Sequence, residues 1–141
     1  QLDRSPYKDF HIQVNTFNNE LLLTGQISSN TLRQQLTAYV KNISDVETIY
    51  NYTTIDRATT TLTRMEDMWI ATKISSQLMT AEAINAAEIK VVTENHVVYF
   101  MGIVTPQQGK IAIDIAEHTQ GVNRVVDLFS YIVKLRKKTT L

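Results

Sequence analysis

Apolar and polar residues alternate along residues 11–17, and a second, more apolar segment follows at residues 20–27. This alternation is typical of half-buried β-strands, because successive side chains on a strand point to opposite faces of the sheet. Asn18 and Asn19 separate the two segments, and asparagine tolerates the positive φ angles of a two-residue hairpin turn. The pattern therefore predicts a β-hairpin, with Gly25 marking a bulge or a close backbone approach.

The hairpin pattern recurs over residues 89–102. Two later residues, Val46 and Ile49, match Val122 and Val125 at an offset of 76 (122 − 46 = 76). A repeat of this length is a whole small domain and not a solenoid unit, so we expect two related modules. Five hairpin residues have identical counterparts 77 positions on (89 − 12 = 77), namely Ile12, Val14, Thr16, Asn18 and Gly25.

A helix and a third strand are predicted after each hairpin. In the first copy, residues 28–30 can cap a helix that runs to about Lys41, before a strand over residues 46–52. In the second copy, Thr105 and Pro106 form a strong helix start, and a strand follows over residues 122–133. The predicted fold class is α+β, with two modules that are each a small three-stranded mixed sheet with helices packed on one face.

The second copy is expected to open with a helix, over about residues 65–80, that the first copy largely lacks. The residues before it, 53–63, are rich in threonine and have no helical periodicity, which indicates a linker. The predicted organisation is a first domain over residues 1–55, a linker over 56–64, a second domain over 65–135 and a basic C-terminal tail over 136–141.

Composition narrows the function classes. The formal net charge of zero argues against a general nucleic-acid binder, which needs a basic surface to displace phosphate counterions. The absence of cysteine excludes disulfides and thiolate chemistry within these 141 residues. No segment approaches the roughly 20 apolar residues that span a bilayer. The chain starts at Gln1, and we expect it to be a mature or trimmed form.

Catalytic and metal-binding motifs do not emerge from the sequence. Asp114 and His118 are four residues apart on a predicted helix, but a zinc site needs at least three protein ligands, so we expect a surface pair. Gly109 stands alone, without a glycine-rich phosphate loop, and no nucleophile elbow is present. We therefore predict no catalytic residues, no metal site and no cofactor.

The predicted helix at residues 65–80 is unusual because its apolar residues fall on two opposed faces. At about 100° per residue, Ile70, Ile74 and Leu78 form an aliphatic stripe, which we expect to be the core face. A two-layer module can bury only one such stripe against its sheet, which leaves the other to be explained. The second stripe and its neighbours are Met65, Met68, Trp69, Thr72, Lys73, Ser76 and Met79.

From the residues alone, two explanations of the second stripe stay open. It can be buried against the other module, as apolar stripes often are. Alternatively, it is an exposed ridge that docks at a membrane interface, where a tryptophan ring with one polar N–H is favoured. Lys73 lies about 40° from Trp69 around the helix and could reach lipid phosphate. The basic residues of the tail would add roughly 1 kcal/mol per charge near an anionic surface.

Four segments of the second copy, residues 68–78, 89–95, 98–105 and 121–126, together resemble the BON domain. The first copy resembles it less strongly, so the likeness covers nearly the whole chain. The resemblance implies an αββαβ order in each module, with the first helix of the first module largely missing.

The resemblance also implies a non-enzymatic periplasmic lipoprotein, anchored in the outer membrane by an acylated N-terminal cysteine that is absent here. The second domain would bind anionic phospholipid, chiefly phosphatidylglycerol, through its first helix. The resemblance further implies support of envelope integrity, localisation to the division site and a link to the β-barrel assembly machinery. Trp69 and Met79 fall on lipid-contacting positions and Lys73 matches a family lysine, whereas Ser76 stands where an arginine is expected.

The leading hypothesis is therefore binding of anionic phospholipid through the second stripe. The alternative is a protein–protein interaction module, in which the same stripe or an exposed sheet edge recruits an envelope or outer-membrane assembly protein. An enzyme is the least supported class. The sequence leaves the oligomeric state and the relative orientation of the modules open.

Overall fold

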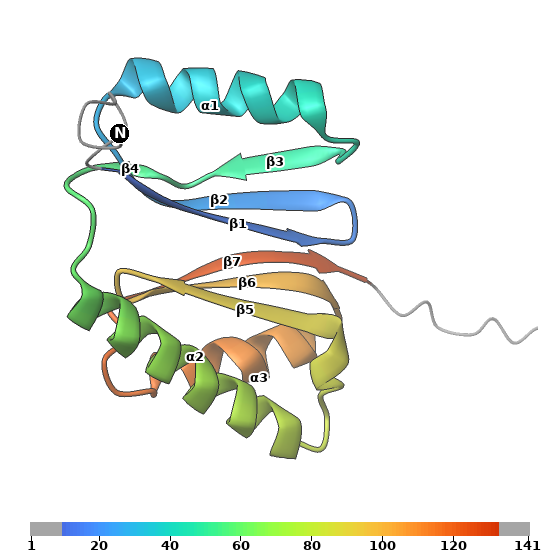
Figure 1. Ribbon diagram of the computed structural model, residues 1–141. Helices are drawn as coiled ribbons and strands as arrows, with labels where there is room; N and C mark the ends of the chain where they lie inside the picture. Colours follow the sequence, from blue (N-terminus) through green and yellow to red (C-terminus); the bar gives the residue numbers. More distant parts are fainter. Residues whose placement is uncertain (1–9, 133–141) are drawn as a thin grey trace, which may run out of the picture. The chain divides into compact units, whose positions relative to one another are not determined.

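The computed structural model describes residues 10–132, and the chain divides into two compact units between Asp67 and Met68. Each unit is a mixed β-sheet with helices on one face (Figure 1). The α+β fold class predicted from the sequence is confirmed. Two predictions concern residues outside the described range. One is that the first helix of the first module is largely missing, and the other is the basic tail at 136–141.

The first unit begins with the hairpin of β1 (His11–Phe17) and β2 (Glu20–Ile27), which pair antiparallel. Helix α1 (Asn30–Ile43) follows and returns the chain to β3 (Thr48–Asn51), which is parallel to β2. A two-residue strand, β4 (Thr54–Ile55), extends this pairing along β2. The core under α1 contains Leu21, Leu23 and Val40, with Ile12, Leu36, Val46 and Ile49 packed against it.

Helix α2 (Thr61–Thr80) crosses the division, and most of its length belongs to the second unit. The short 3-10 helix η2 (Ala86–Glu88) and the hairpin of β5 (Ile89–Glu94) and β6 (Val97–Val104) follow. Helix α3 (Pro106–Glu117) leads to β7 (Arg124–Tyr131), which is parallel to β6. The core lies between the helices and the sheet, and its buried members are Ile70, Ile74, Leu78, Ile89, Val98, Phe100, Val104, Ala112, Ala116 and Phe129.

The two hairpins have the same geometry, as the repeat predicts. Gly25 pairs with Ile12 and has a φ angle of 118°, and Gly102 pairs with Ile89 and has a φ angle of 143°. A Cβ on Gly25 would overlap the carbonyl oxygen of His11. Only glycine avoids both the backbone strain and this overlap, so the prediction of a close backbone approach is confirmed.

The N-terminus of α3 also forms as the sequence predicts. The Thr105 side chain accepts a hydrogen bond from the backbone N–H of Gln108 at 3.2 Å, and the Gln108 side chain accepts one from the backbone N–H of Thr105 at 2.9 Å. This reciprocal pair is a capping box, with Pro106 at the first helical position.

Two expectations about element bounds were wrong. Helix α2 begins at Thr61, four residues before the predicted start at Met65. Residues 53–63 were expected to be a linker, but they contain β4 and the first residues of α2. The Thr60 hydroxyl accepts a hydrogen bond from the backbone N–H of Thr63 at 3.2 Å, which is an N-cap contact. The β-branched threonines hid this start, because they weaken helix propensity and carry no apolar periodicity.

Candidate functional site

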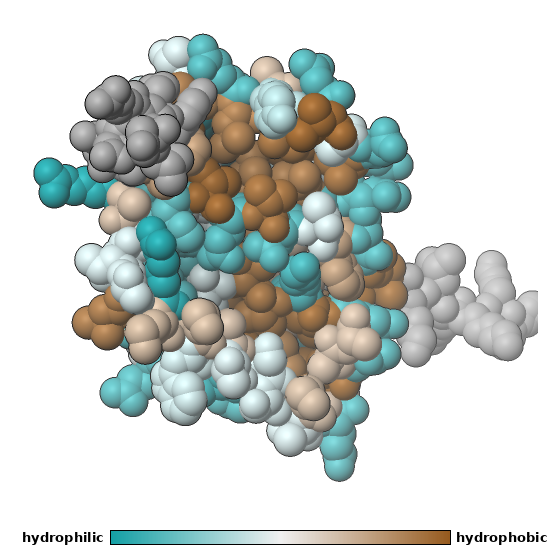
Figure 2. All heavy atoms as spheres, in the orientation of Figure 1, coloured by the Kyte–Doolittle hydropathy of each residue, from teal (hydrophilic) through white to brown (hydrophobic). Residues whose placement is uncertain are grey.

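The outward face of α2 carries a line of large apolar side chains. Met65, Met68, Trp69 and Met79 are 60%, 68%, 63% and 73% exposed, so the second stripe predicted from the sequence is exposed and not buried. Leu62 is 64% exposed and extends this line by almost one turn toward the start of the helix. We call these five residues the α2 ridge. Figure 2 shows the outward surface along α2, which is coloured pale to brown over most of its length.

The opposite face of α2 anchors the ridge to the fold. Ile70, Ile74 and Leu78 are 3%, 0% and 1% exposed and belong to the core of the second unit, which confirms the prediction for the aliphatic stripe. At about 100° per residue, Ile74 in the middle of this stripe lies about 180° from Met65 and about 140° from Trp69. The packing of one stripe therefore fixes the direction in which the other points.

The polar residues among the ridge side chains are compatible with an apolar environment. Thr72 and Ser76 are both exposed. The Thr72 hydroxyl donates to the carbonyl of Met68 at 2.9 Å, and the Thr80 hydroxyl donates to the carbonyl of Gln77 at 3.0 Å. A hydroxyl that bonds back to its own helix has less to lose when water is removed. Thr72 and Thr80 therefore make this surface less polar than two threonines with free hydroxyls would.

Lys73 lies on the flank of the ridge. Its Nζ is 5.7 Å from the centroid of the Trp69 ring, a cation–π distance, and donates to the carbonyl of Gln120 at 3.4 Å. The side chain is half-buried, so its stem packs along the protein surface. The positive charge is therefore held beside the tryptophan ring, at the border between apolar and polar surface.

Sequence reasoning missed Leu62, because the helix was expected to start at Met65. On a helical wheel Leu62 lies about 20° from Trp69, which places it on the same face. The signal that could have found it is the threonine N-cap at position 60, followed by Leu62, Met65 and Trp69 at helical spacing.

The described residues show no catalytic or metal-binding arrangement of the kinds sought in the sequence. Within residues 10–132, no group of three or more His, Cys, Asp or Glu side chains could hold a metal ion. The expected Asp114–His118 side-chain pair is wrong. The His118 Nδ1 instead donates to the Asp114 backbone carbonyl at 2.8 Å, and the Asp114 carboxylate bonds to Lys110 at 3.3 Å.

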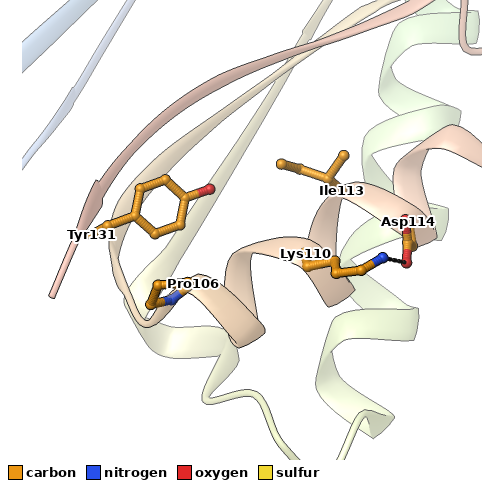
Figure 3. A pocket seen from close by; sticks show the side chains of 5 residues that line it. All are labelled: Pro106, Lys110, Ile113, Asp114 and Tyr131. Carbon is orange, nitrogen blue, oxygen red and sulfur yellow. Dashed lines mark hydrogen bonds and ion pairs between the residues drawn. The ribbon is translucent and has the colours of Figure 1, made fainter. Parts of the chain in front are cut away.

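A shallow hollow of about 390 Å³ gathers Lys110, Asp114 and Tyr131, together with Pro106 and Ile113 (Figure 3). Lys110 and Asp114 pair with each other at exposed positions. Burial raises the pKa of Tyr131, and so does its hydrogen bond to Asp127 at 2.6 Å. A tyrosine that holds its proton more tightly is a poor base, and the neighbouring charges neutralise each other. The hollow therefore lacks the mutually activating groups of a catalytic site.

No helix within the described part of the chain is both long and apolar enough to cross a bilayer.

The sequence pattern of the BON domain matches residues 1–57 and again residues 66–132. The protein therefore belongs to the BON domain family and carries two BON domains in tandem, as the resemblance predicted.

Among individual proteins, the chain is 30% identical over 117 residues to the outer membrane lipoprotein DolP of Haemophilus influenzae, an alignment that covers 83% of this chain and 61% of DolP. It is 29% identical over 125 residues to a 21 kDa hemolysin of Actinobacillus pleuropneumoniae, covering 89% of this chain and 64% of that protein. The chain thus spans a little over three-fifths of the length of these relatives.

A more distant likeness exists to the C-terminal domain of CdsD, a structural protein of the type III secretion system of Chlamydia trachomatis. The TM-score is 0.41 with 11% sequence identity, and the match covers 94% of this chain and 62% of that one. A likeness of this degree carries no information about function.

Proposed function

We propose that the protein binds anionic phospholipid, phosphatidylglycerol in particular, through the α2 ridge and without catalysing a reaction. The observation that supports this most is the exposure of Trp69 and three methionines on one helix face while the opposite face is core. An exposed apolar line of this kind is costly in water and marks an interaction surface. The ring of tryptophan and the cation of Lys73 suit the headgroup boundary of a membrane.

The contact would be peripheral and reversible. Fully burying one large apolar side chain contributes roughly 1.5–3 kcal/mol. Immersion of three ridge side chains would then supply on the order of 5–8 kcal/mol, which corresponds to binding between millimolar and micromolar. An interfacial helix of this strength dissociates readily and holds a protein at a membrane stably only when a second attachment acts with it.

We further propose that the protein acts in the bacterial cell envelope. Its relative DolP is named an outer membrane lipoprotein, and a lipid anchor would supply the second attachment that the ridge needs. Localisation at the inner face of the outer membrane and support of envelope integrity follow from the same proposal. Action at the division site and a link to the β-barrel assembly machinery stay predictions of the family resemblance.

Liposome sedimentation tests the proposal. The Trp69→Glu variant should lose binding to phosphatidylglycerol vesicles while keeping its circular dichroism spectrum, because residue 69 is exposed and not in the core. Gln34→Glu adds the same charge at an exposed position of α1 and should bind like the parent. Equal binding by the two variants would contradict the proposal. Retention of an envelope protein by the parent without lipid, lost in Trp69→Glu, would favour the protein-interaction alternative.

A further inference from the structure

Three of the four methionines of the chain belong to the α2 ridge. Met65, Met68 and Met79 are exposed, whereas the fourth, Met101, is fully buried in β6, between β5 and β7. The 141 residues contain no cysteine. The sulfur atoms that a dissolved oxidant can reach are therefore the thioethers of the ridge.

A thioether reacts with a hydroperoxide without the help of a catalytic residue. The sulfur lone pair attacks one peroxide oxygen, and an S–O bond forms as the O–O bond breaks. The sulfur is oxidised by two electrons, and the peroxide is reduced to an alcohol or to water. The product is methionine sulfoxide, a polar side chain in place of an apolar one. Methionine sulfoxide reductases reverse the change, because two thiols are oxidised to a disulfide and the sulfoxide oxygen leaves as water.

We propose that Met65, Met68 and Met79 form a reversible oxidation site, and that their conversion to sulfoxides by a hydroperoxide releases the α2 ridge from lipid. This inference rests on the function proposed above and concerns the regulation of the same site. Of the five ridge residues, only Leu62 and Trp69 stay apolar after the oxidation. The oxidised ridge therefore loses most of its apolar contact with a membrane.

The threonine hydroxyls next to the ridge methionines are already engaged within the helix. A sulfoxide oxygen is a strong hydrogen-bond acceptor, and burying it without a donor costs free energy. Thr72 lies one turn after Met68, but its hydroxyl donates to the Met68 carbonyl at 2.9 Å. Thr80, the residue after Met79, likewise donates to the Gln77 carbonyl at 3.0 Å. Oxidised side chains here would depend on water, which a bound membrane removes.

The fold does not depend on the residues that would be oxidised. Ile70, Ile74 and Leu78 hold α2 against the core of the second unit, and none of them contains sulfur. Met101 is the methionine whose oxidation would disturb packing, because its side chain is fully buried. Oxidation of the exposed thioethers therefore acts on docking and not on folding.

The test uses the full chain treated with hydrogen peroxide under native conditions, because hydrogen peroxide oxidises thioethers well before indole rings. Trypsin then separates the methionines into peptides of residues 65–73, 74–90 and 91–110. We expect mass spectra in which each ridge methionine gains one oxygen while Met101 gains none. Trp69 lies in the first of these peptides, so oxidation of its ring would be detected.

The oxidised chain should bind phosphatidylglycerol vesicles at least about tenfold more weakly than the untreated chain, with an unchanged circular dichroism spectrum. Methionine sulfoxide reductases specific for the two sulfoxide epimers, supplied with a dithiol, should restore binding. The matched control combines Met65→Leu, Met68→Leu and Met79→Leu, because leucine is apolar and similar in volume. This variant should bind like the untreated parent and should not weaken after peroxide treatment.

Several outcomes would overturn the proposal. These are unchanged binding by the oxidised parent, an equal loss in the leucine variant, and oxidation of Met101 as fast as that of the ridge. In the first of these cases the untreated parent still binds lipid, so the proposed function stands and only this inference fails. A parent that does not bind the vesicles before oxidation contradicts the proposed function, and this inference with it. The untreated sample therefore tells the two failures apart.

Discussion

The Nζ of Lys73 lies 5.7 Å from the centroid of the Trp69 ring. This pair joins a charged group on the flank of the α2 ridge to the largest side chain of the ridge. In water the ring and the ammonium group attract each other, and at a membrane both fit the headgroup boundary, where the ring meets acyl chains and the cation meets phosphate. On the proposed function, this pair would favour an anionic surface over a neutral one.

Lys73→Ala should weaken binding to phosphatidylglycerol vesicles by about fivefold, since one basic residue near an anionic surface contributes roughly 1 kcal/mol. Binding to vesicles of neutral phosphatidylcholine should change little, and the difference between parent and variant should shrink at high salt. Sedimentation at low and high ionic strength measures both effects. Lys73→Arg keeps the charge and serves as the control. An equal loss on neutral vesicles would show that Lys73 acts by packing and not by charge.

Leu62→Ser should weaken vesicle binding by about tenfold, because the apolar side chain lost at the interface contributes about 1.5 kcal/mol. The position is 64% exposed, so the free energy of unfolding should stay nearly unchanged. Leu62→Met is the matched control and should bind like the parent. Since Leu62 joins the ridge only when α2 starts at Thr61, unchanged binding by Leu62→Ser would remove this first turn from the site.

Gly102→Ala should destabilise the protein by about 2 kcal/mol or more, because a residue with a side chain is strained at a φ angle of 143°. The new Cβ would also overlap the carbonyl oxygen of Glu88, the residue just before β5. This carbonyl cannot move away unless the pairing of Ile89 with Gly102 is disturbed. Urea unfolding measures the change. Gly25→Ala should behave in the same way, since the two hairpins share their geometry. A midpoint equal to that of the parent would contradict this account of the repeated glycines.

Thr105→Ala should lower the free energy of unfolding by about 1 kcal/mol, the usual cost of removing an N-cap side chain. The variant loses the acceptor for the Gln108 backbone N–H and half of the capping box. Thr105→Ser keeps the hydroxyl and should retain most of the stability. If the serine variant is as unstable as the alanine variant, the methyl group of Thr105 and not its hydroxyl is responsible.

The hairpins and their glycines were predictable because they depend on local rules. Apolar residues alternate along β1, and Asn18, Asn19, Asn95 and His96 all adopt the positive φ angles that a two-residue turn requires. The start of α2 was not predictable in the same way. The Thr60 hydroxyl caps this helix within a threonine-rich segment whose propensity disfavours a helix. Packing of the later aliphatic stripe supplies most of the stability of the helix.

The sequence predicts the residues on each face of α2 but not which face is exposed. The two faces of α2 follow from the 3.6-residue period, but periodicity cannot say which apolar face is covered. The buried Ile70, Ile74 and Leu78 settle that question only once the helix is placed on its sheet. The position of Lys73 beside Trp69 also depends on the carbonyl of Gln120, which is distant in the sequence.

Fluorescence of Trp69 tests the central claim most directly, since it is the only tryptophan of the chain. Its side chain is 63% exposed, so in buffer its emission should be that of a hydrated indole and an aqueous quencher should reach it. Addition of phosphatidylglycerol vesicles should shift the emission to shorter wavelength and protect the ring from the quencher, whereas phosphatidylcholine vesicles should do so much less. Emission and quenching that stay unchanged at saturating phosphatidylglycerol would contradict lipid binding through the α2 ridge.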